Sequence, residues 1–341
     1  MKGTSNVKHR VAVVGSFVQD LTWKCLDFPR PGETVIGTFV TGPGGKGSNQ
    51  AVASGRAGVP TVFIGAVGND VFAEGARRFY RSEGIGARFV VKPGQATGTA
   101  AILVNAAAEN EIIVALGANA HLRPRDIDPA LIRGAEVVVC QHETNLAVNA
   151  HVFRLARRSR VATVLNPAPM RKDFDPSILR LTDVLIPNES EFCALLEMVP
   201  ACASLGRSDS RPELGGAVLR GKAAANLHRL CRAFGVPTVI VTLGRRGCFV
   251  SLSDGTHTAI PGHTGLKVVD TTGAGDAFVG GFAAGFVKFG GDVVAAARHG
   301  NAVAALSVTK FGTAPSMPTK GEIALFLRMK DSTRFGSRRP G

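Results

Sequence analysis

The sequence predicts one α/β domain: a central, mostly parallel β-sheet between two layers of helices, with a small additional β-sheet. Short apolar runs that end at glycine or polar residues alternate with amphipathic helical stretches, as in parallel sheets covered on both faces. Two regions interrupt this alternation with strand patterns of their own. The 341 residues are 45% hydrophobic, which is enough for a sizeable core.

The apolar runs and the helical stretches give the elements of the main domain in chain order. The first run, residues 11–14, is wholly apolar and ends at Gly15, which is typical of a buried parallel strand. Five further runs read the same way: residues 61–67, 136–140, 161–165, 184–186 and 238–242. Helices are predicted between them at residues 48–57, 71–82, 146–158 and 217–234, and an apolar helix starts directly after Asp276.

The two interrupting regions predict a small β-sheet that we call the lid. Residues 34–40 form an isolated strand, and residues 97–104 and 111–116 form a hairpin whose turn lacks glycine. Residues 200–216 are polar and are expected as a surface insertion, and residues 1–9 and 331–341 as flexible tails.

Composition excludes several classes of function. The net charge is +14, but the basic residues are scattered and aromatic residues make up only 6%, so no specific nucleic-acid site is expected. The six cysteines show neither C-x-x-C nor zinc spacing, as in a reducing compartment. The sequence shows no secretory signal, no apolar membrane span and no C-terminal peroxisomal signal, which favours the cytoplasm, with the nucleus possible in a eukaryote.

The strongest motif is Asp270-Thr-Thr-Gly-Ala-Gly-Asp276, directly before the apolar helix. The backbone N–H groups of Gly273, Ala274 and Gly275 would form an anion hole at the helix N-terminus. Asp276 beside it could take a proton from a hydroxyl that attacks a phosphoryl group. The alternative is a glycine-rich turn with Asp276 as a helix cap, and the motif alone does not decide between them.

A second glycine-rich motif runs from Gly42 to Ala51 and reads GPGGKGSNQA. It is not a P-loop, because Gly47 follows Lys46 where Ser or Thr is needed. Glycine backbone, the Lys46 ammonium and the Asn49 amide can bind sugar hydroxyls instead. The alternative is a flexible loop before a helix.

Polar residues also follow several predicted strands, where ligands of open α/β sheets bind. They are Asp20, Glu143, Asn188 and Glu191. Residues 242–247, TLGRRG, join two apolar runs at the same edge and could also be a simple hairpin turn. The eight histidines show no ligand spacing and are expected to be structural or at the surface.

With these motifs in place, the chain resembles the ribokinase family of ATP-dependent sugar and nucleoside kinases over about residues 10–328. The segments DTTGAGD and GGKGSNQA resemble the two signatures of that family. Shorter matches are PGET at 31–34, GAN at 117–119, NPAP at 166–169, NESE at 188–191 and TLG at 242–244. The resemblance implies a single domain of residues 10–330, folded as a ribokinase-like three-layer sandwich. Its β-sheet lid would span about residues 17–41 and 97–116, and two copies would form a homodimer through it.

The resemblance also implies a role for each matching residue. The catalytic base is Asp276, and the anion hole is formed by Gly273, Ala274 and Gly275. D-ribose is bound by Val18, Gln19, Asp20, Gly45, Lys46, Gly47, Ser48, Asn49, Glu143 and Asp276. ATP is bound by Asn188, Thr242, Leu243, Gly244, Arg245, Arg246, Gly247, Gly275, Asp276 and Asn301. Potassium is held by Asp270, Thr272, Ser307, Lys310, Gly312 and Ser316, and Glu191 organises Mg²⁺ through water.

The implied reaction is transfer of the ATP γ-phosphate to the 5-hydroxyl of D-ribose. One position departs from the pattern: bacterial members often carry Asn where this chain has Val18, and valine cannot bind a hydroxyl. A related kinase for 2-deoxyribose or another small sugar is therefore the alternative. A catalytically idle sugar-binding regulator is a further alternative, but Asp276 and the intact anion hole argue against it.

Overall fold

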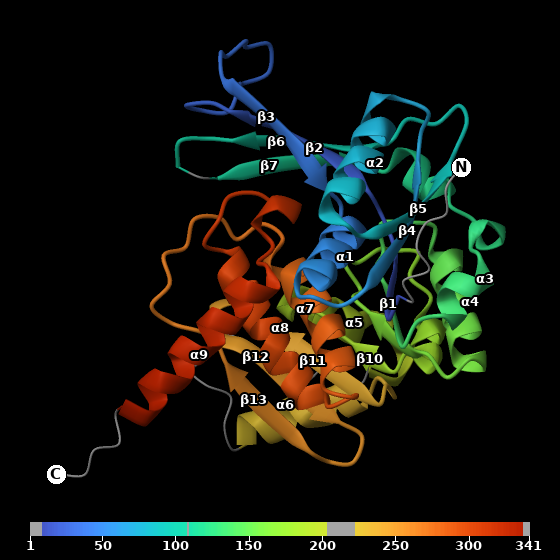
Figure 1. Ribbon diagram of the computed structural model, residues 1–341, viewed down its shortest axis with the longest axis vertical. Helices are drawn as coiled ribbons and strands as arrows, with labels where there is room; N and C mark the ends of the chain where they lie inside the picture. The colour runs from blue at the N-terminus through green and yellow to red at the C-terminus, as the bar shows by residue number, and fades with distance from the viewer. Residues whose placement is uncertain (1–8, 108, 203–221, 337–341) are drawn as a thin grey trace.

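A central β-sheet organises the protein (Figure 1). The structure is a computed structural model that describes residues 9–107, 109–202 and 222–336. The sheet has nine strands in the order β13-β12-β11-β10-β9-β8-β1-β4-β5. Their bounds are β1 Val11–Val14, β4 Thr61–Val67, β5 Gly86–Val91, β8 Val137–Cys140, β9 Ala162–Leu165, β10 Val184–Leu185, β11 Thr238–Thr242, β12 Gly247–Leu252 and β13 His257–Pro261.

The strands of this sheet are parallel except at one edge. In the centre, Val11 of β1 pairs with Thr61 of β4 on one side and with Val137 of β8 on the other. At the edge, β12 pairs antiparallel with both β11 and β13. Residues 242–247 therefore connect the two arms of a β-hairpin, as the simpler interpretation of that segment expected.

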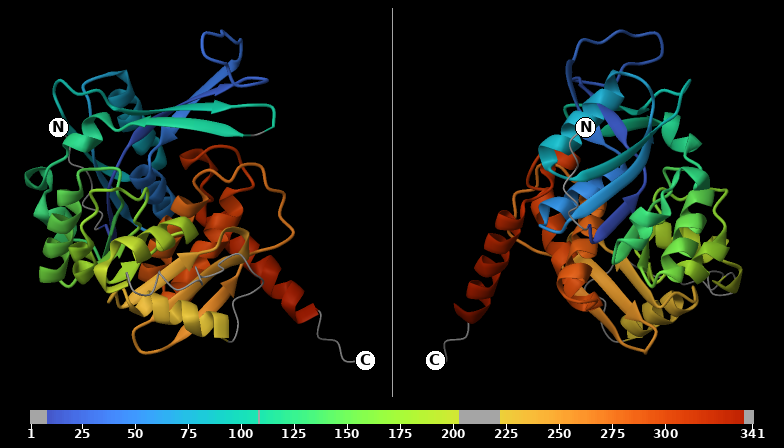
Figure 2. Two further views of the ribbon diagram at one scale, coloured as in Figure 1. Left: turned by 180° about the vertical axis from the view of Figure 1, so that it is seen from behind. Right: turned by 45° about the vertical axis from the view of Figure 1, so that its right-hand side comes forward.

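Helices cover both faces of the sheet, and each face has its own apolar core. One layer contains α1 (Lys46–Arg56), α2 (Val71–Glu83), α7 (Ala274–Lys288), α8 (Val293–Ser307) and α9 (Lys320–Gly336). The other contains α3 (Pro129–Arg133), α4 (Leu146–Arg158), α5 (Glu189–Met198) and α6 (Lys222–Arg232). In the right-hand view of Figure 2 the green helices and the orange and red helices lie on opposite sides. The predicted three-layer sandwich is confirmed.

Glycines let α7 approach its neighbours α1 and α8 at backbone distance. A Cβ atom at Gly280 would lie 2.3 Å from the carbonyl oxygen of Gln50 in α1, and one at Gly281 would lie 2.7 Å from Cβ of Val303 in α8. Real Cβ atoms do not come this close to other heavy atoms. The contact fixes the N-terminal half of α7 against the start of α1.

The lid is a separate sheet of four strands in the order β3-β2-β6-β7 (Figure 1). The strands are β2 Val18–Lys24, β3 Thr38–Gly44, β6 Gly98–Val104 and β7 Asn110–Ala115. The predicted strand at 34–40 is displaced: β3 pairs with β2 from Lys24–Thr38 to Val18–Gly44, so it runs into the glycine-rich motif. Because side chains alternate along β2, Asp20 and Trp23 lie on opposite faces of the lid.

Several boundaries differ from those predicted. Helix α1 begins at Lys46 rather than Ser48, and α9 continues to Gly336, into the segment expected as a tail. Pro200–Cys202 form a 3₁₀ turn, whereas the rest of the expected insertion at 200–216 lies outside the described residues. Among the residues described, no helix combines the length and the apolarity that crossing a bilayer requires.

Candidate active site

Asp276 lies in the first turn of α7 and is 6% exposed. The helix starts after Gly273, whose φ of 76° is a left-handed conformation that suits glycine. Two amides from α1 orient the carboxylate: Asn49 Nδ2 donates to Oδ2 at 3.0 Å, and Gln50 Nε2 donates to Oδ1 at 2.9 Å. The close packing of α7 on α1 thus places the predicted base beside the second motif.

Buried amides beneath Asp276 hold Gln50 in one orientation. Gln50 Nε2 also donates to Asn166 Oδ1 at 3.0 Å, and Gln141 Nε2 donates to Gln50 Oε1 at 2.6 Å. These three residues were not among the predicted site residues. Gln50 and Asn166 both stand within the quoted motifs GGKGSNQA and NPAP, which was the available signal.

The anion hole differs in one detail from its prediction. Gly273, Ala274 and Gly275 all line a cavity of about 180 Å³ that also contains Asp276 and Lys46. However, the Ala274 N–H donates to the carbonyl of Thr271 at 3.2 Å. The N–H groups of Gly275 and Asp276 remain first-turn donors of α7, where an anion is stabilised by the helix N-terminus.

Glu143 joins the ends of β1 and β8 to the start of α1. Its Oε2 accepts from the Ser16 hydroxyl at 2.5 Å and from the Lys46 N–H at 2.9 Å. Gly47 lies so close to Gly15 that a Cβ there would be 2.7 Å from the Gly15 Cα. Glu143 therefore fixes the N-terminus of α1, a role in which Ser16, absent from the predicted set, takes part.

The Lys46 side chain faces three carboxylates. The negative charge of Asp276, followed by those of Glu143 and Glu191, raises the pKa of Lys46, although burial opposes this change. The ammonium is therefore charged at neutral pH. Glu191 itself is held in a reciprocal helix cap with Asn188, with N–H to side-chain oxygen distances of 2.8 and 2.9 Å. Burial raises the pKa of Glu191.

Asp20 of the lid also belongs to this group. Burial raises the pKa of Asp20 to about 6, the charges of Glu143 and Asp276 act in the same direction, and a hydrogen bond from Thr313 opposes them. Val18, on the same face of β2, is 2% exposed. Gln19 lies on the opposite face, where its Nε2 donates to the Thr41 hydroxyl at 2.6 Å. The structure therefore does not bring the Gln19 side chain to the other predicted sugar residues.

A larger cavity of about 560 Å³ adjoins the small one, and both are lined by Thr242, Thr271, Ala274 and Gly275. The predicted nucleotide residues that line it are Thr242, Gly244, Arg245, Gly247, Gly275 and Asn301. Of the other four, Asn188 and Asp276 line the small cavity, whereas Leu243 is buried in the core and Arg246 pairs with Glu189. A third cavity, of about 530 Å³ beside α4, is lined by none of the predicted site residues.

Of the other residues predicted to bind sugar, Ser48 and Gly47 make contacts that position α1. The hydroxyl of Ser48 accepts from the Tyr80 hydroxyl at 3.1 Å. Gly45, with φ 89°, caps the helix and makes room for the backbone N of Val18. These residues shape the start of α1, whose Lys46 and Asn49 side chains face Asp276.

Of the residues predicted to hold potassium, Ser307 and Ser316 donate their hydroxyls to the carbonyls of Ala304 and Thr313, whereas Thr272 and Gly312 contact Asp270. Its carboxylate accepts from the Thr272 N–H at 2.9 Å and from the Gly312 N–H at 3.0 Å. Lys310 turns its ammonium to Glu322 at 2.6 Å, so only its carbonyl could face a cation. Within the described ranges, no group of three or more His, Cys, Asp or Glu is placed to hold a metal ion. The carboxylate of Asp270 and the carbonyl and hydroxyl oxygens of this loop are oxygen ligands, which suit hard cations.

A helix N-terminus, a carboxylate that can take a proton, a charged lysine and two joined cavities define a phosphotransferase that acts on a hydroxyl of a small molecule. The chain belongs to the pfkB family of carbohydrate kinases, and the sequence model of that family matches residues 8–320. The resemblance inferred from the motifs is thereby confirmed.

Individual relatives agree with this assignment. The chain is 35% identical over 323 residues to the ribokinase of Mus musculus (93% of this chain, 94% of that one). It is 33% identical over 325 residues to the deoxyribokinase of Salmonella typhi (94% and 99%). The structure of Arabidopsis thaliana ribokinase complexed with ribose and ATP superposes with a TM-score of 0.77 at 26% identity, covering 94% of this chain and 99% of that one. The protein is an ATP-dependent sugar kinase.

Proposed function

We propose that this kinase is a ribokinase, which transfers the γ-phosphoryl group of ATP to the 5-hydroxyl of D-ribose. The observation that carries the proposal is the position of Asp276, which two amides orient at the point where the small cavity meets Lys46 and the N-terminus of α7. The similarity to the mouse ribokinase and to the Arabidopsis complex with ribose and ATP supports this substrate pair.

In this mechanism Asp276 accepts the proton of the 5-hydroxyl as its oxygen attacks the γ-phosphorus. The Gly275 and Asp276 N–H groups and the Lys46 ammonium stabilise the negative charge on the transferred group. Asn49 Oδ1 is buried and has no partner among the described residues, so it can accept from a sugar hydroxyl. Asp20 and Glu143 supply further acceptors on the same side of Asp276.

The nucleotide occupies the larger cavity in this proposal, with its adenosine beside Thr242–Gly247 and Asn301 and its phosphates toward Gly275. Glu191 lines the small cavity and would organise Mg²⁺ through water. Bound Mg²⁺ neutralises phosphate charge.

The proposed location of the kinase in the cell is the cytoplasm.

Activation by potassium over sodium is expected at fixed ionic strength. The proposed site around Asp270 lies where the segment before α7 meets the loop after α8. In that loop Thr313 lies beside Gly273, which precedes the first residue of α7. An ion there stabilises the arrangement of that loop. Initial rates in potassium and in sodium chloride, after dialysis against a potassium-free buffer, test this. Equal rates would remove the cation site from the proposal.

ADP release with ribose, 2-deoxyribose, fructose and adenosine in turn tests the function. The highest kcat/KM is expected for ribose. A clear preference for fructose or adenosine, or no ADP release with any of the four, would overturn the proposal.

A kinase for 2-deoxyribose is the second candidate, and one observation favours it. Val18 is buried on the side of β2 proposed to face the sugar, two residues before Asp20. An asparagine at this position could have formed a hydrogen bond with the 2-hydroxyl. A site that does not bind a hydroxyl discriminates weakly against the analogue that lacks it. The relative from Salmonella typhi named deoxyribokinase is nearly as similar as the mouse protein. A kcat/KM for 2-deoxyribose above that for ribose would select this candidate.

We also propose a homodimer formed by the face of the lid that points away from Asp20. Trp23, Phe39 and Ile113 on this face are 40, 51 and 72% exposed, a run of apolar side chains that a partner lid would cover. Ile113→Lys is expected to give a monomer in sedimentation velocity, because it would bury a charge in the interface. Val71→Lys, equally exposed at 71% but on α2, is the control and should leave the dimer intact. A monomeric wild type would refute the dimer.

A further inference from the structure

Thr313 connects the loop between α8 and α9 to the sugar side of the lid. Its hydroxyl lies 3.0 Å from Oδ2 of Asp20 and 3.2 Å from the carbonyl oxygen of Pro43. Asp20 and Thr313 are separated by 293 positions in the chain. Thr313 is 9% exposed, so water competes little for this contact.

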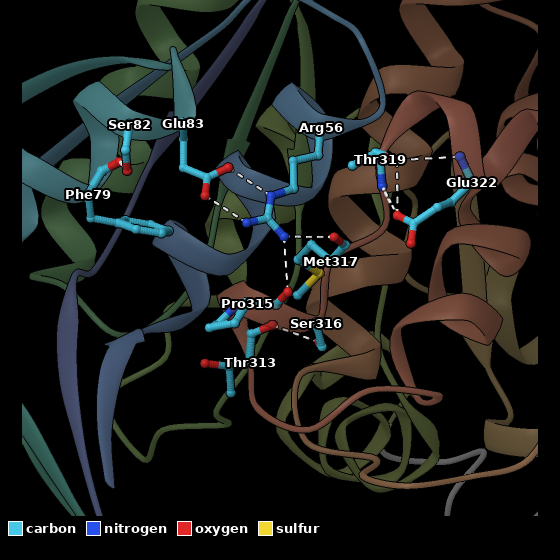
Figure 3. A network of polar contacts seen from close by, with 10 residues as sticks. All are labelled: Arg56, Phe79, Ser82, Glu83, Thr313, Pro315, Ser316, Met317, Thr319 and Glu322. Carbon is cyan, nitrogen blue, oxygen red and sulfur yellow. Dashed lines mark hydrogen bonds and ion pairs between the residues drawn. The ribbon is translucent and has the colours of Figure 1, made fainter.

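Contacts that do not depend on Asp20 fix the position of this loop (Figure 3). The Arg56 guanidinium at the end of α1 binds both carboxylate oxygens of Glu83, at 2.6 and 2.7 Å. Its Nη1 donates to the carbonyls of Pro315 at 3.0 Å and of Met317 at 2.8 Å. The Ser316 hydroxyl donates to the Thr313 carbonyl at 2.8 Å. The loop that carries Thr313 is therefore fixed by contacts that do not involve Asp20.

Asp20 faces mainly groups that disfavour its charge. Glu143, after β8, and Asp276, on α7, are carboxylates that raise its pKa, as burial does, whereas the Thr313 hydroxyl lowers it. The backbone of β3 closes one side of the carboxylate, since a Cβ at Gly44 would lie 2.2 Å from Oδ2 and 2.4 Å from Oδ1. Among the described residues, Thr313 thus supplies a side-chain hydrogen bond to this carboxylate.

We propose that Thr313 is a positioning residue for sugar recognition: its hydroxyl donates to Oδ2 of Asp20 and turns Oδ1 toward a sugar hydroxyl. The inference rests on the proposed function, because it deepens the role of Asp20 in the sugar site. It gives the loop after α8 a part in sugar affinity that acts through Asp20. Thr313→Val keeps the shape of the side chain and removes the donor, whereas Thr313→Ser keeps the donor.

The first test needs no substrate. Aspartate labelled with ¹³C at the carboxyl carbon is titrated by NMR, and the Asp20 signal is identified from its loss in Asp20→Asn. In Thr313→Val the pKa of Asp20 should rise by about one unit, while Thr313→Ser and the loop control Thr309→Val, whose hydroxyl bonds the Leu306 carbonyl, stay close to wild type. An unchanged pKa in Thr313→Val would overturn the proposal.

The second test measures the sugar. With an ionised Asp20 required for binding, the KM for ribose in Thr313→Val should exceed that of wild type by about tenfold on the acidic side of both pKa values. This ratio should shrink as the pH rises above them, with the KM for ATP and kcat unchanged. An unchanged KM for ribose at every pH, or an equal increase in the KM for ATP, would refute positioning. If wild type phosphorylates no sugar, the proposed function fails, and the NMR titration still decides the contact.

Discussion

Asp276→Asn is expected to lower kcat by about 10²–10⁴-fold while sugar and ATP still bind, because the variant retains the shape of the side chain but not the base. The structure also shows how the amide fits. Asn49 can reverse its amide and offer the unpartnered Oδ1 to the new NH₂ group. Gln50 cannot, since Asn166 and Gln141 fix its orientation. The new amide oxygen must therefore face Gln50.

Steady-state kinetics with ribose and ATP measure this effect, and isothermal titration measures sugar binding separately. Asp292→Asn is the matched control, because Asp292 also stands at the N-terminus of a long helix but caps α8 through Ala295. The control should keep normal turnover. Turnover of Asp276→Asn within a few-fold of wild type would remove Asp276 from the role of base.

Gly280→Val is expected to destabilise the protein by about 3 kcal/mol or more, since overpacking of this kind forces backbones apart. The new Cβ would meet the Gln50 carbonyl at 2.3 Å and the Ala53 Cβ at 2.6 Å, on the neighbouring helix. Any protein that still folds must move α1 away from α7. The amide pair of Asn49 and Gln50 would then leave Asp276, so activity should fall in the folded fraction as well.

The midpoint of urea unfolding, followed by circular dichroism, reports the stability change. Gly75→Ala is the control: a Cβ there meets nothing within 4 Å, and α2 gains helix propensity of about 1 kcal/mol. Opposite shifts of the two midpoints are expected. A Gly280→Val variant as stable and as active as wild type would show that the two helices do not need this backbone contact.

Sequence patterns predicted the elements that depend on one physical signal. Strands such as β1 and β4 are buried on both faces, so their runs are wholly apolar. Strand β2 was not predicted as a strand, because its sequence VQDLTWK mixes site residues with an outward apolar face. The end of β3 was assigned to a loop, because it consists of glycine and proline, and pairing with β2 overrides that local preference.

The candidate site divides in the same way. Asp276, Lys46 and Asn49 stand in motifs whose residue types already indicate phosphate and hydroxyl chemistry. Ser16 and Thr313 were missed, because each acts through one partner, 127 and 293 positions away. The orientation of Gln19 follows from strand alternation, which becomes decisive only once β2 is known to be a strand.

The hydrogen bonds from Arg56 to the loop after α8 have an evolutionary consequence. The guanidinium binds carbonyl oxygens of Pro315 and Met317, and these oxygens are present whatever side chains the two positions carry. Mutations can therefore accumulate along the outside of this loop without moving Thr313 or Ser316. Substitution of Arg56 or of its partner Glu83, in contrast, removes the contact that fixes the loop. Drift among descendants of this chain should spare that pair while it changes exposed positions of the loop, such as Pro315.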